Sequence, residues 1–499
     1  MLGGLVLALM AGFSVAEGNY MQMAMYAGAL VGSIYALFLN QGWIHFGFLW
    51  GCTCFLMQPI GFSIGTMEVG CLLAAIYIFM NGWRKSAFDS TPVASHFKPF
   101  VGCVILLILY CGIHFLYNRT DPWNNEFISW KTAAKQYLLM TGGFLLISVA
   151  VSMPKSCWQL KNPVIPLAWC LLIGNLINIA IRGYATFVMG AGQVDIITGM
   201  EFQIASFHIP ILNLTDNIYA LRTLAPLSAV MATAMLTSKA AYARRNSNRL
   251  LAVVLFVCAL AGAMLSSGRA TLIMVIFLSI LLLLMRKRYV AVALATVASI
   301  LFIVSARALY EYDDRLISAG LQRSLAMIPG MGMERAKASI DSSSDWRTQL
   351  FYMALDDWKQ SPRTILTGRC VYEFTERDSL RIAGDDVSSY TMITAVRRGA
   401  THTVLTDLLV TVGLVGLLLY LTTYGALLSA IYSSRKELDP ASPLYDIRLP
   451  LMIILSVSLP LGIIASGFVQ PTDAFLVATL ACASIGRGTK RMKSERKSP

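Results

Sequence analysis

The sequence predicts an all-α polytopic membrane protein with about fourteen transmembrane helices and one large, partly helical polar loop. Hydrophobic residues make up 56% of the 499-residue chain and charged residues only 13%, which is too little polar surface for a soluble protein of this length. Apolar runs recur from end to end, and runs of about 20 residues are long enough to cross a bilayer as helices. Because these runs are apolar throughout rather than alternating, they do not fit transmembrane strands.

The apolar runs divide the chain into four parts. Residues 1–306 are predicted to form an N-terminal bundle of about eleven spans, 307–402 the large polar loop, 403–487 about three further spans, and 488–499 a basic tail. The first run, 2–16, has no positive charge before it, so we interpret it as a span and not as a signal peptide. The other spans are predicted at about 23–40, 43–60, 65–82, 99–117, 137–153, 163–181, 218–237, 250–266, 270–285, 289–306, 404–432, 449–467 and 471–486.

Short basic loops predict the orientation of these spans. With fourteen spans, one side of the membrane receives the basic tail and the loops 84–98, 155–161, 239–249, 286–288 and 435–448. Positive residues in short loops stay in the cytoplasm, so both termini are predicted to be cytoplasmic. The loops 118–136, 182–217 and 307–402 then face the opposite side. This distribution accounts for the net charge of +13 without a nucleic-acid partner.

The large loop is rich in arginine although it is predicted to lie outside the cytoplasm. It holds only two lysines, Lys337 and Lys359. The planar guanidinium group of arginine binds phosphate oxygens through two parallel hydrogen bonds, so a pyrophosphate ligand would explain the preference. The alternative is that these arginines pair with acidic residues of the same loop.

One amphipathic helix is predicted inside this loop, from Trp346 to about Gln360. Apolar residues recur there at helical spacing, the cluster 342–345 is typical of a helix start, and Pro362 ends the pattern. We expect the helix to lie on the membrane surface with its aromatic residues in the headgroup zone. Arg347 would then lie beside lipid phosphates.

Two junctions between polar and apolar sequence supply further candidate residues. Arg269 stands between two apolar runs, where a charge is unfavourable unless it reaches the interface or binds an anion. His402 stands where the large loop meets the span at 404–432, shortly after Arg397 and Arg398. An imidazole can accept a proton near neutral pH, although it can also simply cap a helix.

The sequence predicts neither a metal nor a cofactor. The acidic pairs 313–314, 356–357 and 385–386 lack a third ligand at metal-binding spacing. No phosphate-binding loop and no dinucleotide fingerprint is present, which excludes a soluble domain that would use a nucleotide sugar through those motifs.

Three motifs together resemble the bacterial O-antigen ligase and Wzy-type polysaccharide polymerase superfamily. The first is His402-Thr403-Val404-Leu405 followed by the glycine pattern 412–417, and the second is Ser267-Gly268-Arg269-Ala270. The third is Arg347 with Ala354-Leu355, Pro362, Gly368 and Phe374. The chain departs from the family pattern in having Thr403 in place of the usual Asn, Gly268 inserted before Arg269, and Gly368-Arg369-Cys370 in place of Gly-x-Gly.

The resemblance implies a GT-C-like, metal-independent and inverting glycosyltransferase of the bacterial inner membrane, with its active site facing the periplasm. Its donor would be a glycan on undecaprenyl pyrophosphate, and its acceptor a glycan or lipid A-core hydroxyl. Arg269 and Arg347 would hold the pyrophosphate, and His402 would take the acceptor proton. Arg397, Arg398 and Arg222 would be further contacts to donor phosphates or acceptor charges. Membrane lipids and a chain-length regulator are the other partners implied.

Several functions remain open at this level. A polymerase and a ligase differ only in the acceptor, and a protein O-oligosaccharyltransferase is a near relative of both. A transporter or flippase of lipid-linked oligosaccharide is an alternative from another class. It would predict ionisable residues at mid-membrane and internal repeats. The sequence offers mainly Glu68 for the former and no repeat for the latter.

Overall fold

The computed structural model describes the chain from residue 56 to residue 464, with gaps. Its continuous ranges are 95–119, 140–145, 164–187, 220–266, 271–313, 319–326, 334–369, 403–434 and 442–464. Short pieces add 56–57, 64–65, 137, 147–148, 151, 206–209, 212–215, 317, 328, 392–393, 395–396 and 401. Most of the first four predicted spans, Glu68, the fourteenth span and the tail lie outside the described residues.

The described chain is almost entirely helical, and its long helices fall on the predicted spans. These helices are α5 (Lys98–Arg119), α7 (Val164–Phe187), α9 (Ala220–Leu236), α10 (Asn246–Leu265), α11 (Thr271–Met285), α12 (Tyr289–Tyr312), α18 (Val404–Ser433) and α19 (Pro443–Ile464). Four described segments are long and apolar enough to cross a membrane, namely Lys98–Tyr117, Asn246–Leu265, Tyr289–Tyr312 and Val404–Ser433. The apolar helices therefore indicate a membrane protein.

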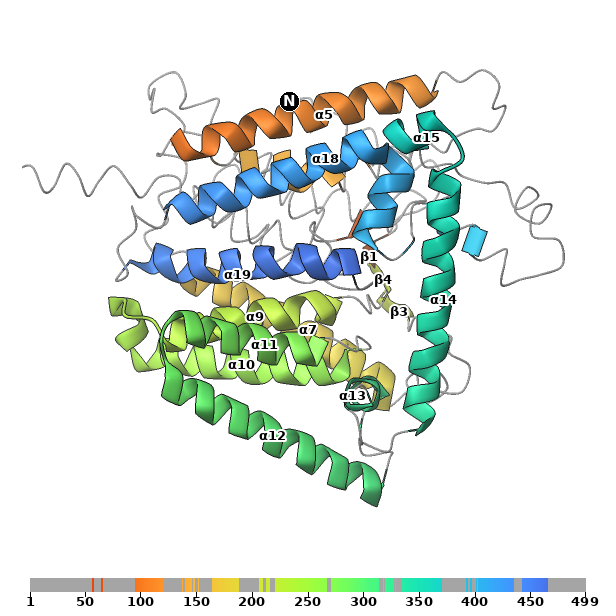
Figure 1. The fold of residues 1–499 in the computed structure, drawn as a ribbon. Helices are drawn as coiled ribbons and strands as arrows, with labels where there is room; N and C mark the ends of the chain where they lie inside the picture. Colours follow the sequence, from red (N-terminus) through yellow and green to blue (C-terminus); the bar gives the residue numbers. More distant parts are fainter. Residues whose placement is uncertain are drawn as a thin grey trace, which may run out of the picture.

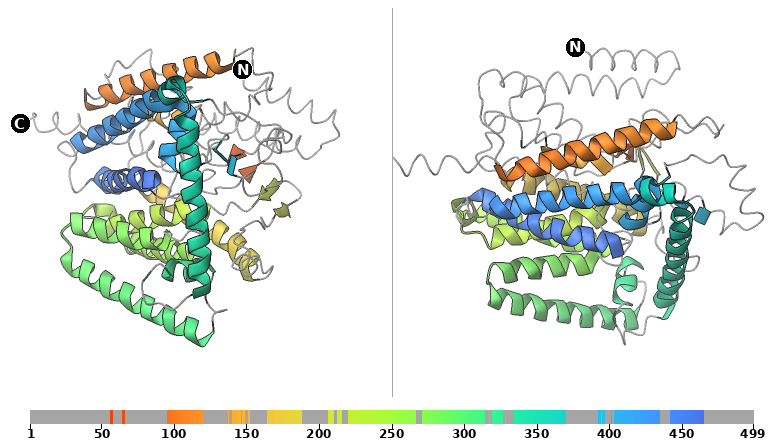
Figure 2. Two further views of the ribbon diagram at one scale, coloured as in Figure 1. Left: turned by 45° about the vertical axis from the view of Figure 1, so that its right-hand side comes forward. Right: turned by 45° about the horizontal axis from the view of Figure 1, so that its top comes forward.

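The long helices lie side by side, and one helix of the polar loop crosses their ends (Figure 1). That helix is α14 (Glu334–Trp358), which follows the short α13 (Ala319–Leu325) and precedes the short α15 (Pro362–Thr367). The other two views show the same crossing (Figure 2). Helix α14 therefore covers one end of the group of long helices.

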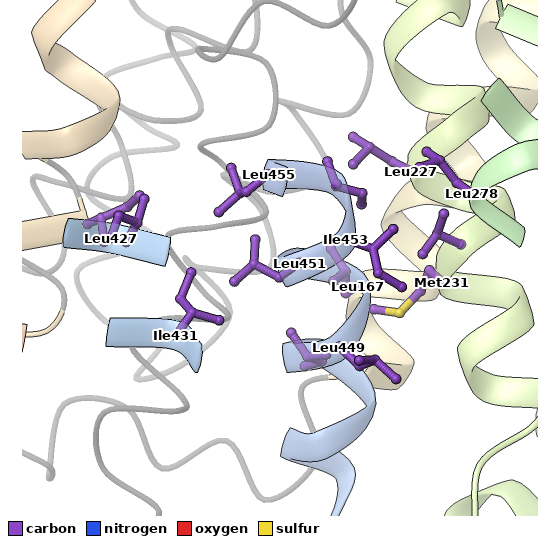
Figure 3. Packing of buried hydrophobic residues seen from close by; sticks show 14 of the residues in the cluster. Leu167, Leu227, Met231, Leu278, Leu427, Ile431, Leu449, Leu451, Ile453 and Leu455 are labelled. Carbon is purple, nitrogen blue, oxygen red and sulfur yellow. The ribbon is translucent and has the colours of Figure 1, made fainter. Parts of the chain in front are cut away.

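The core lies between α18, α19, α9 and α7. Leu427 and Ile431 of α18 face Leu451 and Leu455 of α19, and the far side of α19 meets Met231 of α9 (Figure 3). Helices α9 and α10 pack closely against each other, because small residues line their contact, namely Ala225, Ala229, Ala259, Gly262 and Ala263. Small residues let helix backbones approach in a membrane, where apolar burial does not drive association.

Helix α12 differs from the others because its apolar side chains are mostly exposed. Val290 is 77% exposed and Leu294 is 66% exposed, whereas Ala306 is the helix's one buried residue. A surface of this kind is stable against hydrocarbon and not against water. The exposure therefore supports the interpretation of 289–306 as a membrane span.

A small antiparallel sheet is an exception to the all-α prediction among the described residues. Its order is β2 (Ile64–Gly65), β1 (Leu56–Met57), β4 (Leu212–Thr215) and β3 (Ser206–Ile209). The predicted span at 43–60 is therefore not a helix at its end, because Leu56 pairs with Thr215. Strands of two to four residues leave no period long enough to detect in an apolar run.

The basic loops at one end of the bundle are joined by a buried ion pair. The Arg286 Nη2 and Asp446 Oδ1 atoms lie 2.6 Å apart, and their side chains are only 8% and 1% exposed. The Tyr242 hydroxyl donates to Asp446 Oδ2 at 2.8 Å, and Ser238 also donates to that oxygen. Arg286 Nη1 further donates to the Ala234 carbonyl oxygen at 2.8 Å. These contacts therefore hold the start of α19 against the ends of α9 and α11.

Candidate active site at the junction of α14, α15 and α18

Two of the six predicted site residues, Arg347 and Arg222, are described by the structure. The other four, His402, Arg269, Arg397 and Arg398, lie outside the described residues. Two of these four positions have described residues on both sides in the sequence. Thr401 and Thr403 flank position 402, and Ser266 and Thr271 lie on either side of position 269. The geometry of the site is therefore built from Arg347 and from the turn that contains Thr401 and Thr403.

Thr403 is the N-cap of α18. Its backbone is extended, with φ −129° and ψ 138°, and its hydroxyl accepts a hydrogen bond from the Thr406 backbone N–H at 3.2 Å. Its hydroxyl also contacts the Thr406 hydroxyl. Thr403 suits this position in physical terms, because Thr, like Asn, caps helix N-termini well.

Asp407 accepts hydrogen bonds from Thr401, the residue before position 402. Its Oδ1 atom accepts from both the Thr401 backbone N–H and the Thr401 hydroxyl, each at 2.6 Å. Thr401 is 1% exposed, and its hydroxyl also contacts that of the fully buried Thr406. This contact was not predictable from a capping box, because Asp407 is the fourth and not the third residue after the N-cap and bonds a residue before that cap.

Helix α18 is broken ten residues after its N-cap. Gly413 has φ 68° and ψ −170°, which no helical residue adopts. The prediction of one span at 404–432 is right in extent, but it did not include this break. Two carbonyl oxygens of α18 near the break accept hydrogen bonds from groups outside the helix. The Arg369 backbone N–H donates to the Val410 oxygen at 2.6 Å, and the Tyr110 hydroxyl of α5 donates to the Val412 oxygen at 2.7 Å.

The end of α15 fits into the break in α18 through a contact between two glycines. Gly368 also has a positive φ, 73°, and a Cβ atom there would lie 2.5 Å from the Gly413 nitrogen. A Cβ atom on Gly413 would lie 2.4 Å from the Leu366 carbonyl oxygen. Backbone meets backbone here, so only glycine fits at either position. Both glycines belong to the motifs noted in the sequence, and the structure brings them together.

Helix α14 carries Arg347 and packs on the first half of α18. Leu350 and Ala354 are fully buried and cluster with Val410 of α18 and with Met392 and Val396. The predicted apolar stripe of this helix is thus confirmed, but it faces protein and not the headgroup zone, because α18 covers it. The side chain of Arg347 itself is partly exposed.

The start of α14 differs from the prediction. The helix begins at Glu334, so the serines 342–344 lie inside it and do not cap it. The segment before Trp346 has no apolar stripe from which a helix could be predicted. Pro362 begins α15 instead of merely ending α14, and Ser361 caps that helix in a capping box with Thr364.

Arg222 belongs to a different part of the bundle. It lies on α9, which packs against α7, α10, α11 and α19. Its Nε atom is buried, as is that of Arg323 on α13, the short helix at the ends of α10 and α11. Arg347 is therefore on a helix that packs on the first half of α18, whereas Arg222 is on a helix that packs among α7, α10, α11 and α19.

Acidic, histidine and cysteine side chains do not converge in the described ranges, where no group of three could hold a metal ion. A comparison of the sequence with models of known protein families gave no match, and neither did a comparison with curated protein sequences.

Proposed function

We propose that the protein is a membrane glycosyltransferase that moves a glycan from undecaprenyl pyrophosphate to an acceptor hydroxyl. The reaction belongs to the polymerisation or ligation of cell-surface polysaccharide. The proposal places the protein in the bacterial inner membrane with both termini in the cytoplasm and the site facing the periplasm. The basic loops gathered around Asp446 support this orientation.

One observation carries the proposal, namely the brace on both sides of position 402. Thr401 is held by Asp407, and Thr403 is fixed as the N-cap of α18. A general base needs a fixed position relative to its proton donor, and side chains on a braced turn meet that requirement.

In the proposed reaction the acceptor oxygen attacks the anomeric carbon of the donor sugar. The bond between that carbon and the pyrophosphate oxygen breaks, and undecaprenyl pyrophosphate leaves from the opposite face, so the configuration inverts. His402 takes the proton of the acceptor hydroxyl. Arg347 and Arg269 stabilise the charge that develops on the leaving pyrophosphate. Arg397, Arg398 and Arg222 are further candidates for donor or acceptor contacts.

The test uses purified protein in vesicles with an undecaprenyl-pyrophosphate oligosaccharide and an unlabelled glycan or lipid A-core acceptor. We expect His402→Ala to lower the rate by about 100-fold or more, and Arg347→Ala by about 100-fold. Arg307→Ala is the matched control, because Arg307 is half-exposed on α12 and pairs with Glu311 at 2.9 Å. Glycan transfer at the wild-type rate by either His402→Ala or Arg347→Ala would contradict the mechanism. The acceptor that is used separates a polymerase from a ligase.

A further inference from the structure

The break in α18 takes a helical donor away from the Val412 carbonyl oxygen. In an α-helix each N–H donates to the carbonyl oxygen four positions earlier, so Gly416 would donate to Val412. The loop that this bond closes includes Gly413, whose φ of 68° and ψ of −170° are not helical. The Val412 oxygen therefore needs another donor, because an unsatisfied carbonyl group is unfavourable inside a membrane.

Tyr110 of α5 supplies that donor. Helix α5 runs beside α18 (Figure 1), and the Tyr110 hydroxyl donates to the Val412 oxygen at 2.7 Å. The Gly416 backbone N–H, which a regular helix would use for this bond, hydrogen-bonds the same hydroxyl. The Tyr110 hydroxyl therefore stands between the two backbone groups that the break separates.

Gly416 makes room for the Tyr110 ring. A Cβ atom on Gly416 would lie 3.0 Å from Tyr110 Cε1 and 2.4 Å from Val412 Cβ. Gly425 in the same helix differs, since nothing lies within 4 Å of its Cβ position. Two glycines of the pattern 412–417 therefore have distinct roles, because Gly413 permits the break and Gly416 admits the side chain that bridges it.

Neighbouring aromatic groups hold the Tyr110 ring. It stacks on the His114 imidazole one turn further along α5, with ring centroids 5.9 Å apart and planes 24° apart. His114 Nδ1 in turn hydrogen-bonds the Tyr137 hydroxyl at 2.5 Å, and both of these side chains are buried. A ring that packing already holds loses little conformational entropy when its hydroxyl forms a hydrogen bond.

Two donors from outside α18 act at the break, and they differ in kind. Arg369 uses its backbone N–H, which donates to the Val410 oxygen at 2.6 Å. Tyr110 uses a side-chain hydroxyl, which a single substitution removes. A glycine between two helical segments allows a range of angles, so contacts from outside decide which angle the segments adopt.

We propose that Tyr110 is a positioning residue for the candidate active site. Its hydroxyl fixes the half of α18 that ends at Val412 relative to the rest of the helix. That half begins after Thr403 and carries Asp407, which accepts from Thr401, so the turn around position 402 moves with it. The structural part of this inference concerns α18 alone, whereas its consequence for catalysis rests on the proposed function.

Hydrogen exchange measured by mass spectrometry tests the structural part on the full chain in nanodiscs, without substrate. Tyr110→Phe removes one oxygen atom and keeps the ring against Gly416, so the variant should fold. We expect the amides of 404–412 to exchange about tenfold faster, as the loss of one hydrogen bond predicts, and those of 418–433 to exchange as in wild type. Tyr312→Phe is the matched control, because Tyr312 on α12 is 85% exposed, and it should change neither rate.

Gly416→Ala tests the same contact from the side of α18. The added methyl group displaces the Tyr110 ring, so exchange of 404–412 should rise by about tenfold or more, whereas Gly425→Ala should leave it unchanged. The double variant Tyr110→Phe/Gly416→Ala should exchange no faster than Gly416→Ala, because both changes act through one contact. Additive effects would contradict this role of Tyr110.

Steady-state kinetics in the vesicle assay tests the consequence for catalysis. We expect kcat of Tyr110→Phe to fall about tenfold with little change in KM, because the base is less well positioned while the substrate contacts remain. An unchanged kcat or an unchanged exchange of 404–412 would overturn the proposal. Equally faster exchange in both halves of α18 would also overturn it, since it indicates general destabilisation. If wild type transfers no glycan, the proposed function fails, and the exchange measurement alone decides the role of Tyr110.

Discussion

The two ends of the helix bundle each contain an aspartate in the first turn of a helix, and the two aspartates have different partners. Asp446 of α19 accepts from Arg286 of the α11–α12 turn and from Tyr242 and Ser238 of the loop after α9. Asp407 of α18 accepts two hydrogen bonds from one residue, Thr401, six positions earlier. The first aspartate joins separate helices, and the second shapes a single turn.

The surroundings of the two aspartates fit this difference. At the basic end, burial and the neighbouring Asp446 carboxylate raise the pKa of Tyr242 well above its usual range, so its phenol stays protonated and remains a donor. Arg448 also closes this end by donating to the Ile431 and Tyr432 carbonyl oxygens of α18 at 2.9 and 3.1 Å. At the other end, hydroxyls and glycine backbone predominate. The basic end therefore joins separate helices through charged side chains, whereas the α14–α18 end is shaped by hydroxyl and backbone contacts.

The largest effect is expected at the basic end, from Asp446→Ala. This change leaves the buried Arg286 without its carboxylate partner, which destabilises a protein by about 3–5 kcal/mol. Thermal unfolding in detergent measures the loss. Glu311→Ala is the control, because it breaks the exposed pair with Arg307 and costs less than about 1 kcal/mol. Equal melting temperatures for the two variants would show that the Asp446 network does not hold the bundle together.

A somewhat smaller effect is expected from Gly413→Ala at the α15–α18 contact. The positive φ and the close Leu366 oxygen together predict a loss of about 2–4 kcal/mol. Gly425→Ala in the same helix is the matched control, since nothing lies within 4 Å of its Cβ position. We expect that control to be neutral or slightly stabilising. Circular dichroism melts of both variants test this, and two indistinguishable melts would contradict the backbone contact.

The smallest loss of stability is expected from Asp407→Asn, which sharpens the comparison between the two aspartates. The amide oxygen still accepts hydrogen bonds from Thr401, so the cost should be about 1 kcal/mol. If the proposed function is right, turnover should fall about tenfold while KM changes little, because the base is less well positioned. The measurement is steady-state kinetics with a melt of the same sample. An unchanged turnover number, or a melting temperature as low as that of Asp446→Ala, would contradict the distinction between the two ends.

Much of this architecture was predictable because its signals are local. The spans at 99–117, 218–237, 250–266 and 270–285 appear as helices with ends within about four residues of prediction, and the one at 163–181 continues to Phe187 as α7. An apolar run must satisfy its own backbone hydrogen bonds in lipid, so its helix is predictable. The apolar stripe of α14 was predictable from its period. The start of α14 was not, because a polar segment shows no face that must be buried.

The arrangement of the candidate site was not predictable, because contacts between residues far apart in the sequence build it. Gly368 and Gly413 belong to different motifs 45 positions apart in the numbering of the chain, and nothing in either motif indicates that their backbones touch. The same holds for Tyr110, which donates across 302 positions to the Val412 oxygen. The sheet was missed for a similar reason, since β1 and β4 pair across more than a hundred residues.

The sequence by itself predicted a helical membrane protein, the positions of the apolar helices that the structure describes and the residue types at the proposed site. Each of these follows from hydrophobicity, from the charge of short loops or from the chemistry of a single side chain. The tertiary structure alone decided that α18 is broken, that α15 fits into the break, and that α14 packs on the half-helix that begins at Thr403. The physical reason is that a backbone donor or acceptor can be satisfied by any partner the fold brings near. That choice depends on three-dimensional packing and leaves no period in the sequence.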